Sequence, residues 1–140
     1  MSNLDNLGNV LIRSDLNVPI KNGEITDNFR ILKSVENIEN IIDKSRTITF
    51  TSHMGRPEGK DINLSLRPVA ESMTNILGKE VCFIEEVFGE KVKEQIEKSE
   101  SKIFLLENLR FEKGEVGNDK NFAKQITKPF NSYIFDAFGA

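Results

Sequence analysis

Basic and polar residues follow the apolar runs of this 140-residue sequence in a pattern that suits binding of a small anion. In chain order they are Asp15, Asn17, Arg30, His53, Arg56, Arg110 and Asp136. Guanidinium groups bind phosphate or carboxylate through paired N–H donors, so several arginines at one site suit a ligand with more than one anionic group. A carboxylate and an amide beside them suit a hydroxyl group on that ligand, and could also hold an arginine in place.

Five short apolar runs predict the strands that would position these residues. They lie at residues 10–12, 48–50, 81–84, 103–106 and 133–135. Runs that are apolar throughout are typical of strands covered on both faces, as in a parallel sheet flanked by helices. Ligands of such sheets bind at the carboxyl ends of the strands, which is where the residues named above would emerge.

Helical periodicity fills the gaps between these runs. From Phe29, apolar residues at spacings of three and four predict one helix face, made by Ile31, Leu32, Val35, Ile38, Ile41 and Ile42. A second helix has Ser65 as its expected N-cap and Gly78 as its stop. Two shorter helices are expected at residues 89–98 and 119–127, the latter ending before Pro129. The alternation predicts an α/β fold, a three-layer open parallel sheet with flanking helices, in one domain over residues 1–140.

Composition excludes several classes of protein. A content of 38% hydrophobic and 29% charged residues fits a globular domain with a real core, and a net charge of -3 argues against a nucleic-acid-binding surface. No apolar run approaches 18 residues and no signal peptide is evident, so neither a membrane partner nor secretion is expected. The single cysteine, Cys82, has no partner for an internal disulfide and is expected as apolar filler in a reducing cytoplasm.

Familiar catalytic motifs are missing from the sequence. Neither G-x-G-x-x-G nor G-x-x-x-x-G-K-[ST] occurs, and there is no G-x-S-x-G or H-E-x-x-H. Nucleotide-phosphate binding, serine hydrolysis and zinc proteolysis therefore lose their support, and no metal ligands are expected.

Each candidate residue also has an ordinary structural explanation. His53 could be a structural or surface histidine, and Asp15 and Asn17 could bond to nearby backbone amides in a turn. Arg110 could pair with Glu107 or Glu112, and Arg30 could be a solvated helix residue; Arg13 and Arg67 are interpreted as structural. Agreement among separate segments at one edge favours the anion site.

Four sequence blocks resemble the phosphoglycerate kinase family. They are V-L-I-R-S-D-L-N-V-P at residues 10–19, T-S-H-M-G-R-P at 51–57, L-L-E-N-L-R-F at 105–111 and D-A-F-G at 136–139. The match runs in order from about residue 9 to the last residue, and it includes S-L-R-P-V-A at residues 65–70. One departure is Leu16, where the family commonly has Phe, an apolar exchange expected to alter packing more than chemistry.

The resemblance implies a reaction and roles for the residues. Enzymes of this family move a phosphoryl group between 1,3-bisphosphoglycerate and ADP, with magnesium, and their N-terminal domain holds the glycerate. Asp15 and Asn17 would contact the substrate's hydroxyl side, and His53, Arg56 and Arg110 would grip 3-phosphoglycerate. Arg30 would also face the transferring phosphoryl group, as the catalytic residue of this part. The family is usually monomeric and cytoplasmic.

The family continues beyond the D-A-F-G block into a sixth strand and a second domain that binds Mg-ATP or Mg-ADP. The expectation is therefore a partial glycerate-binding domain, incomplete at its C-terminal end, without its nucleotide-binding domain and without catalysis alone. One alternative is a stand-alone module that binds phosphoglycerate without chemistry. Another is a nonfunctional fragment that folds poorly for want of its last strand.

Overall fold

The structure of the chain is a computed structural model. It describes residues 7–14, 16–21, 24–36, 38, 41–52, 65–108 and 120–136, with the backbone alone for residues 120–123, 135 and 136.

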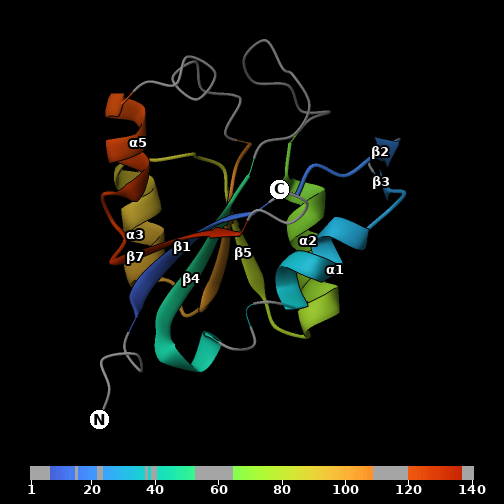
Figure 1. Ribbon diagram of the computed structural model, residues 1–140, viewed down its shortest axis with the longest axis horizontal. Helices are drawn as coiled ribbons and strands as arrows, with labels where there is room; N and C mark the ends of the chain where they lie inside the picture. Colours follow the sequence, from blue (N-terminus) through green and yellow to red (C-terminus); the bar gives the residue numbers. More distant parts are fainter. Residues whose placement is uncertain are drawn as a thin grey trace.

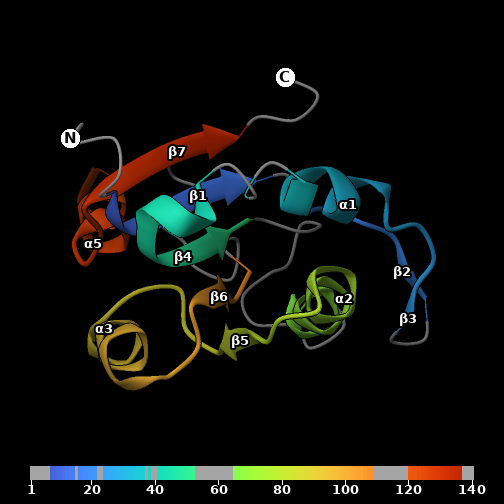
Figure 2. The same cartoon turned by 90° about the horizontal axis from the view of Figure 1, so that it is seen from below.

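Five parallel strands form the central sheet. They are β1 (Gly8–Ser14), β4 (Ser45–Thr51), β5 (Val81–Ile84), β6 (Ile103–Leu106) and β7 (Ser132–Asp136). Their order across the sheet is β5-β6-β4-β1-β7, and every neighbouring pair is parallel. Figure 2 shows the arrows of β7, β1 and β4 pointing the same way. All five apolar runs are therefore confirmed as strands of one parallel sheet.

Helices cover both faces of the sheet (Figure 1). One face carries α1 (Phe29–Glu36) and α2 (Arg67–Leu77), and the other carries α3 (Glu90–Lys98) and α5 (Lys120–Thr127). Alternate residues of β1 point to opposite faces, because Val10 and Ile12 pack toward α1 and α2 whereas Leu11 packs toward α3 and α5. The three-layer α/β architecture is confirmed.

Each face has its own hydrophobic core. The α1/α2 core consists of Val10, Ile12, Leu16, Val18, Ile31, Val35, Ile38, Ile48, Phe50, Leu66, Val69, Ala70, Met73, Val81, Ile103 and Leu105. The α3/α5 core consists of Leu11, Ile84, Val87, Val92, Ile96, Phe104, Leu106 and Ile126. Strands β1, β5 and β6 contribute side chains to both cores, as expected of strands that are covered on both faces.

Helix α2 ends as expected but begins one residue later. Gly78 is its C-cap in the left-handed conformation (φ 68°), and its amide donates to the carbonyl of Thr74 at 2.9 Å. The N-cap is Leu66, so the expectation that Ser65 caps the helix is wrong by one position. Ser65 instead accepts a hydrogen bond from the Arg67 amide (3.2 Å) and donates its own hydroxyl proton to Glu107 (2.7 Å).

Helix α1 is shorter than its apolar pattern predicts. It ends at Glu36, and a 3₁₀ turn, η3 (Ile42–Lys44), precedes β4. The amide of Ile41 donates to Ile38 and that of Lys44 donates to Ile41, both at 3.0 Å and both three residues back, so the backbone there is tighter than an α-helix. The prediction of one continuous helix face through Ile42 is therefore wrong.

A small antiparallel hairpin was not predicted. Its strands are β2 (Ile20–Lys21) and β3 (Glu24–Ile25), with Ile20 opposite Ile25. Both isoleucines are partly buried against the α1/α2 core, and the hairpin leads the chain from the end of β1 to the start of α1.

Candidate functional site

The sheet brings the carboxyl ends of three strands side by side. In the register of β1 with β7, Ser14 lies opposite Asp136, and in the register of β1 with β4, Arg13 lies opposite Thr51. The segments that follow these strands therefore emerge at one edge of the sheet, where ligands of open α/β sheets bind. We call this the carboxyl edge.

Only part of the predicted anion site lies within the described structure. Asp15, His53, Arg56 and Arg110 are outside the described residues, and Asp136 is described by its backbone alone. Asn17 and Arg30 are described with their side chains. The structural placement of the candidate site therefore rests on these two and on the residues around them.

Asn17 and Arg30 are brought together by a direct hydrogen bond. Arg30 is an exposed residue in the first turn of α1, and its Nη1 donates to the main-chain carbonyl oxygen of Asn17 at 2.8 Å. The start of this helix is fixed by Asp27, whose Oδ1 accepts a hydrogen bond of 3.0 Å from the amide of Phe29. The bond from Arg30 fastens α1 to the loop that leaves β1, and it places a permanent positive charge beside that loop.

A second bond joins the loops that leave β1 and β4. The amide of Leu16 donates to the hydroxyl oxygen of Ser52 at 3.0 Å, and both residues are fully buried. Ser52 is the last residue before the segment that contains His53 and Arg56. The backbone before Asn17 is thus held to the end of β4.

Glu107 makes a third connection, which sequence reasoning missed. It directly follows β6 and is 4% exposed. One carboxyl oxygen accepts from the amides of Leu66 and Asn108, both at 2.9 Å, and the other accepts from the Ser65 hydroxyl at 2.7 Å. The signal in the sequence is an acidic residue immediately after an apolar strand. The sequence alone suggests Arg110 or no particular residue as its partner, and not the start of α2.

Arg67 has structural partners, as expected. Its guanidinium pairs with the Glu85 carboxylate and lies over the ring of Phe83, 4.8 Å from the ring centroid. These contacts join the start of α2 to β5 and to the residue that follows it.

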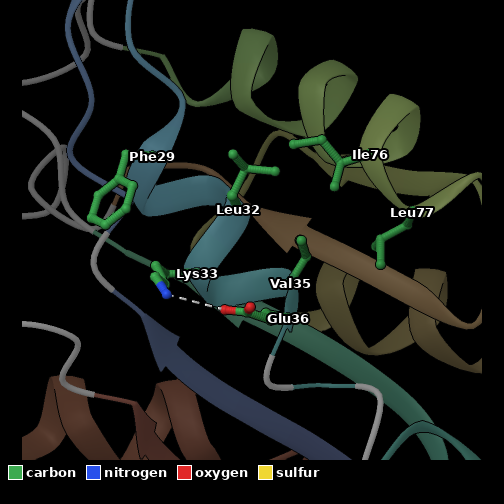
Figure 3. Close-up of a pocket in the computed structure, with 7 residues that line it drawn as sticks. All are labelled: Phe29, Leu32, Lys33, Val35, Glu36, Ile76 and Leu77. Carbon is green, nitrogen blue, oxygen red and sulfur yellow. Dashed lines mark ion pairs between the residues drawn. The ribbon is translucent and has the colours of Figure 1, made fainter.

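A separate apolar groove of about 460 Å³ lies between α1 and α2 (Figure 3). Phe29 and Leu32 on its α1 side are 51% and 42% exposed, which corrects the placement of Leu32 on a buried helix face. Ile76 and Leu77 line the α2 side, and the ion pair of Lys33 with Glu36 lies at its rim. Its lining is too apolar for the doubly anionic ligand that the arginines suggest.

Cys82 is only partly buried, in β5, beside the α3/α5 core. Burial raises the pKa of its thiol, the charge of Glu80 raises that pKa further, and a hydrogen bond with Ser99 opposes the rise. A raised pKa keeps the thiol protonated and poorly nucleophilic at neutral pH. This agrees with a packing role.

None of the helices described is long and apolar enough to cross a membrane. Within the same part of the chain, no group of three or more His, Cys, Asp or Glu side chains is arranged to hold a metal ion.

Comparison with known proteins identifies the family. The family model described as phosphoglycerate kinase matches residues 3–140. The chain belongs to the phosphoglycerate kinase family. Among curated relatives, the phosphoglycerate kinase of Wolbachia pipientis subsp. Culex pipiens is 48% identical over 93% of this chain, and that of Thermosipho africanus is 43% identical over 93% of it.

Solved phosphoglycerate kinases share the fold. The structure from Coxiella burnetii has a TM-score of 0.79 and 34% identity over 96% of this chain. The structure from Pyrococcus horikoshii has a TM-score of 0.81 and 27% identity over 95% of it. The chain spans about a third of the length of the curated phosphoglycerate kinases it matches, 33% in both relatives named above.

Proposed function

We propose that this chain supplies the 3-phosphoglycerate-binding part of a phosphoglycerate kinase, as one domain over residues 1–140. The reaction is phosphoryl transfer between 1,3-bisphosphoglycerate and ADP, which gives 3-phosphoglycerate and ATP in glycolysis. The observation that carries the proposal is the match to the family model across residues 3–140. We further propose that the protein acts as a cytoplasmic monomer, without nucleic-acid or membrane partners.

The substrate would lie at the carboxyl edge. We assign Asp15 and Asn17 to its hydroxyl side, and His53, Arg56 and Arg110 to its anionic groups. The bonds that fasten α1 and the end of β4 to the loop after β1 support this assignment, because they hold Leu16 and Asn17, the two residues that follow Asp15, in place. A ligand with two anionic groups and a hydroxyl is the class that these residue types suit.

Arg30 is proposed as the catalytic residue of this part. Most of the catalysis of phosphoryl transfer is positioning and electrostatic stabilisation, so the residue needed is a fixed cation that faces the moving group. Arg30 supplies a guanidinium cation, and its bond to the Asn17 carbonyl restrains where the guanidinium sits. That restraint supports its role in stabilising charge on the phosphoryl oxygens.

The nucleotide would be held elsewhere in the family protein. We propose that Mg-ATP or Mg-ADP binds in the second domain of the family protein, where oxygen ligands would hold the metal. Family enzymes close two half-sites on each other about a hinge, so a polypeptide of these 140 residues is expected to bind the acid substrate without turning it over.

Two measurements test this proposal. Calorimetric titration of the purified chain with 3-phosphoglycerate should give saturable binding with a Kd of about 1 mM or tighter. Glycerol 3-phosphate, which lacks the carboxylate, should bind more weakly. A coupled assay with ATP and 3-phosphoglycerate should show no turnover above background. Absence of 3-phosphoglycerate binding by a folded chain would refute the binding role, and clear turnover would refute the need for a second half-site.

A further inference from the structure

Glu107 joins two segments of the chain that are far apart in sequence. Glu107 is 4% exposed, and its carboxyl group accepts hydrogen bonds from three donors, in Ser65, Leu66 and Asn108. The first two lie at the start of α2, 42 and 41 residues before Glu107, whereas Asn108 begins the segment that follows β6. The buried side chain of Glu107 therefore joins the start of α2 to the segment that follows β6.

The geometry uses both oxygens of the carboxyl group. Oε1 accepts from two main-chain amides at 2.9 Å each, and Oε2 accepts from the Ser65 hydroxyl at 2.7 Å. An amide at the N-terminus of a helix lacks an acceptor within the helix, and Glu107 provides one for Leu66. Loss of the carboxyl group would leave these buried donors without their acceptor, which is costly.

The surroundings of this cluster are also fixed. The amide of Glu107 donates to the carbonyl of Glu86 at 3.2 Å, which ties the end of β6 to the segment that follows β5. Ser65 and Asn108 are buried, the latter completely. Because these residues are buried and bonded to one another, movement of Glu107 would be transmitted to its neighbours.

Both joined segments continue into residues assigned to the substrate. In the sequence, Arg110 is two residues beyond Asn108, and the segment with His53 and Arg56 runs from Ser52 to Ser65. We propose that Glu107 is a positioning residue for substrate binding, which fixes the residues at which these two basic segments join the described part of the domain. This inference rests on the proposed function, and it adds a residue that does not itself contact the substrate.

Glu107 also constrains where the substrate's anionic groups bind. The N-terminus of a helix is commonly an anion site because its amides point outward. At α2 the amide of Leu66 is already used by Glu107, and that of Arg67 by the Ser65 hydroxyl. An acidic side chain at this position also disfavours a second anion beside it. The anionic groups of the substrate would therefore bind to the basic side chains and not to the N-terminus of α2.

Three variants and one control test the inference. Glu107→Ala removes both acceptor oxygens, and Glu107→Gln keeps the shape and one of them. Ser65→Ala removes one of the three donors to Glu107, together with the acceptor of the Arg67 amide. Val92→Ala is the control, because Val92 is 1% exposed in α3 and belongs to the α3/α5 core, on the other face of the sheet from α2. All four are compared with the wild-type chain by thermal unfolding, titration with 3-phosphoglycerate, and two-dimensional amide NMR.

Binding should weaken in order of the bonds removed. We expect Glu107→Ala to raise the Kd for 3-phosphoglycerate about tenfold or more, as displacement of contact groups by a fraction of an ångström can do. Glu107→Gln should recover part of that loss, and Ser65→Ala should have the smallest effect. Val92→Ala should lower the melting temperature yet leave the Kd within about twofold. If Glu107→Ala does not fold, Glu107→Gln and Ser65→Ala are compared with the wild type and the control.

The NMR spectra separate this inference from the proposed function. In the Glu107 variants, amide signals should move at Leu66 and Asn108 and also within residues 53–64 and 109–111. If the wild type fails to bind 3-phosphoglycerate while those distant signals still move, the proposed function fails, the role in substrate binding fails with it, and only the coupling of Glu107 to the two segments stands. Wild-type affinity in the folded Glu107 variants, or shifts confined to Leu66 and Asn108, would overturn the inference.

Discussion

The guanidinium Nη1 of Arg30 donates a 2.8 Å hydrogen bond to the main-chain carbonyl oxygen of Asn17. Because the acceptor belongs to the main chain, this bond does not depend on the amide side chain of Asn17. The two residues can therefore be tested separately: a change at Asn17 alters a proposed substrate contact and keeps the bond, whereas a change at Arg30 removes it.

Replacement of Arg30 should affect binding far more than folding. Arg30→Ala removes a charge and the bond to Asn17, and we expect the Kd for 3-phosphoglycerate to rise about tenfold. The free energy of unfolding, measured in urea, should fall by less than about 1 kcal/mol because the side chain is exposed. Arg30→Lys should recover little, since an ammonium lacks the planar arrangement of donors.

Arg46 offers the matched control for Arg30. It is also an exposed arginine, but it lies in β4 at the opposite, amino end of the strand. Arg46→Ala removes the same charge from the domain and should leave the Kd unchanged. Equal weakening in both variants would mean that overall charge, and not the position of Arg30, determines binding.

Two threonines of β4 should respond to valine substitution with opposite signs. The Thr49 hydroxyl is fully buried and makes no hydrogen bond in the structure, and its strand neighbours Leu11 and Phe104 belong to the α3/α5 core. Thr49→Val should therefore raise the free energy of unfolding by about 1 kcal/mol.

Thr47 has a partner, and its replacement should be unfavourable. Its hydroxyl donates to Asn9 Oδ1 at 2.7 Å, and Thr47→Val leaves that acceptor without its donor. We expect a loss of about 1 kcal/mol in the same urea experiment. A stabilised Thr47→Val, or a Thr49→Val that is less stable than the wild type, would contradict the hydrogen bonding described for this strand.

Cys82 should make the domain less stable at alkaline pH. Burial and the Glu80 charge raise the pKa of its thiol in the folded state, so the unfolded chain loses this proton first as the pH rises. The stability that the protonated thiol contributes is fully present below the ordinary thiol pKa. It is lost as the pH rises through the pKa of the thiol in the folded state. Between about pH 8 and pH 10 the melting temperature of the wild type should fall more than that of Cys82→Val. Parallel curves for the two proteins would contradict this coupling.

Local signals made much of the fold predictable. Strands β5 and β6 are apolar throughout because helices cover both faces of the sheet, and Gly78 ends α2 because its left-handed conformation suits glycine. The apolar pattern after Phe29 failed to show where α1 ends. There, bonds to residues three positions back replace the helical ones as the chain turns toward β4, and periodicity alone does not distinguish the two.

The site was harder to predict, because its connections are tertiary. The partners of Glu107 lie up to 42 residues away, and nothing in their local sequence indicates that they meet. The acceptor for Arg30 is a main-chain oxygen, which residue types do not reveal. What the sequence did predict was the edge of the sheet, since residues after parallel strands emerge together.

The central claim is that the carboxyl edge binds 3-phosphoglycerate, and an NMR titration of the isotope-labelled chain tests it most directly. Signals of Asn17, Arg30, His53 and Arg110 should shift progressively and saturate, whereas the signal of Arg46, at the opposite, amino end of β4, should remain in place. A well-dispersed spectrum that does not change at millimolar 3-phosphoglycerate, or shifts confined to surfaces away from the carboxyl edge, would contradict the account.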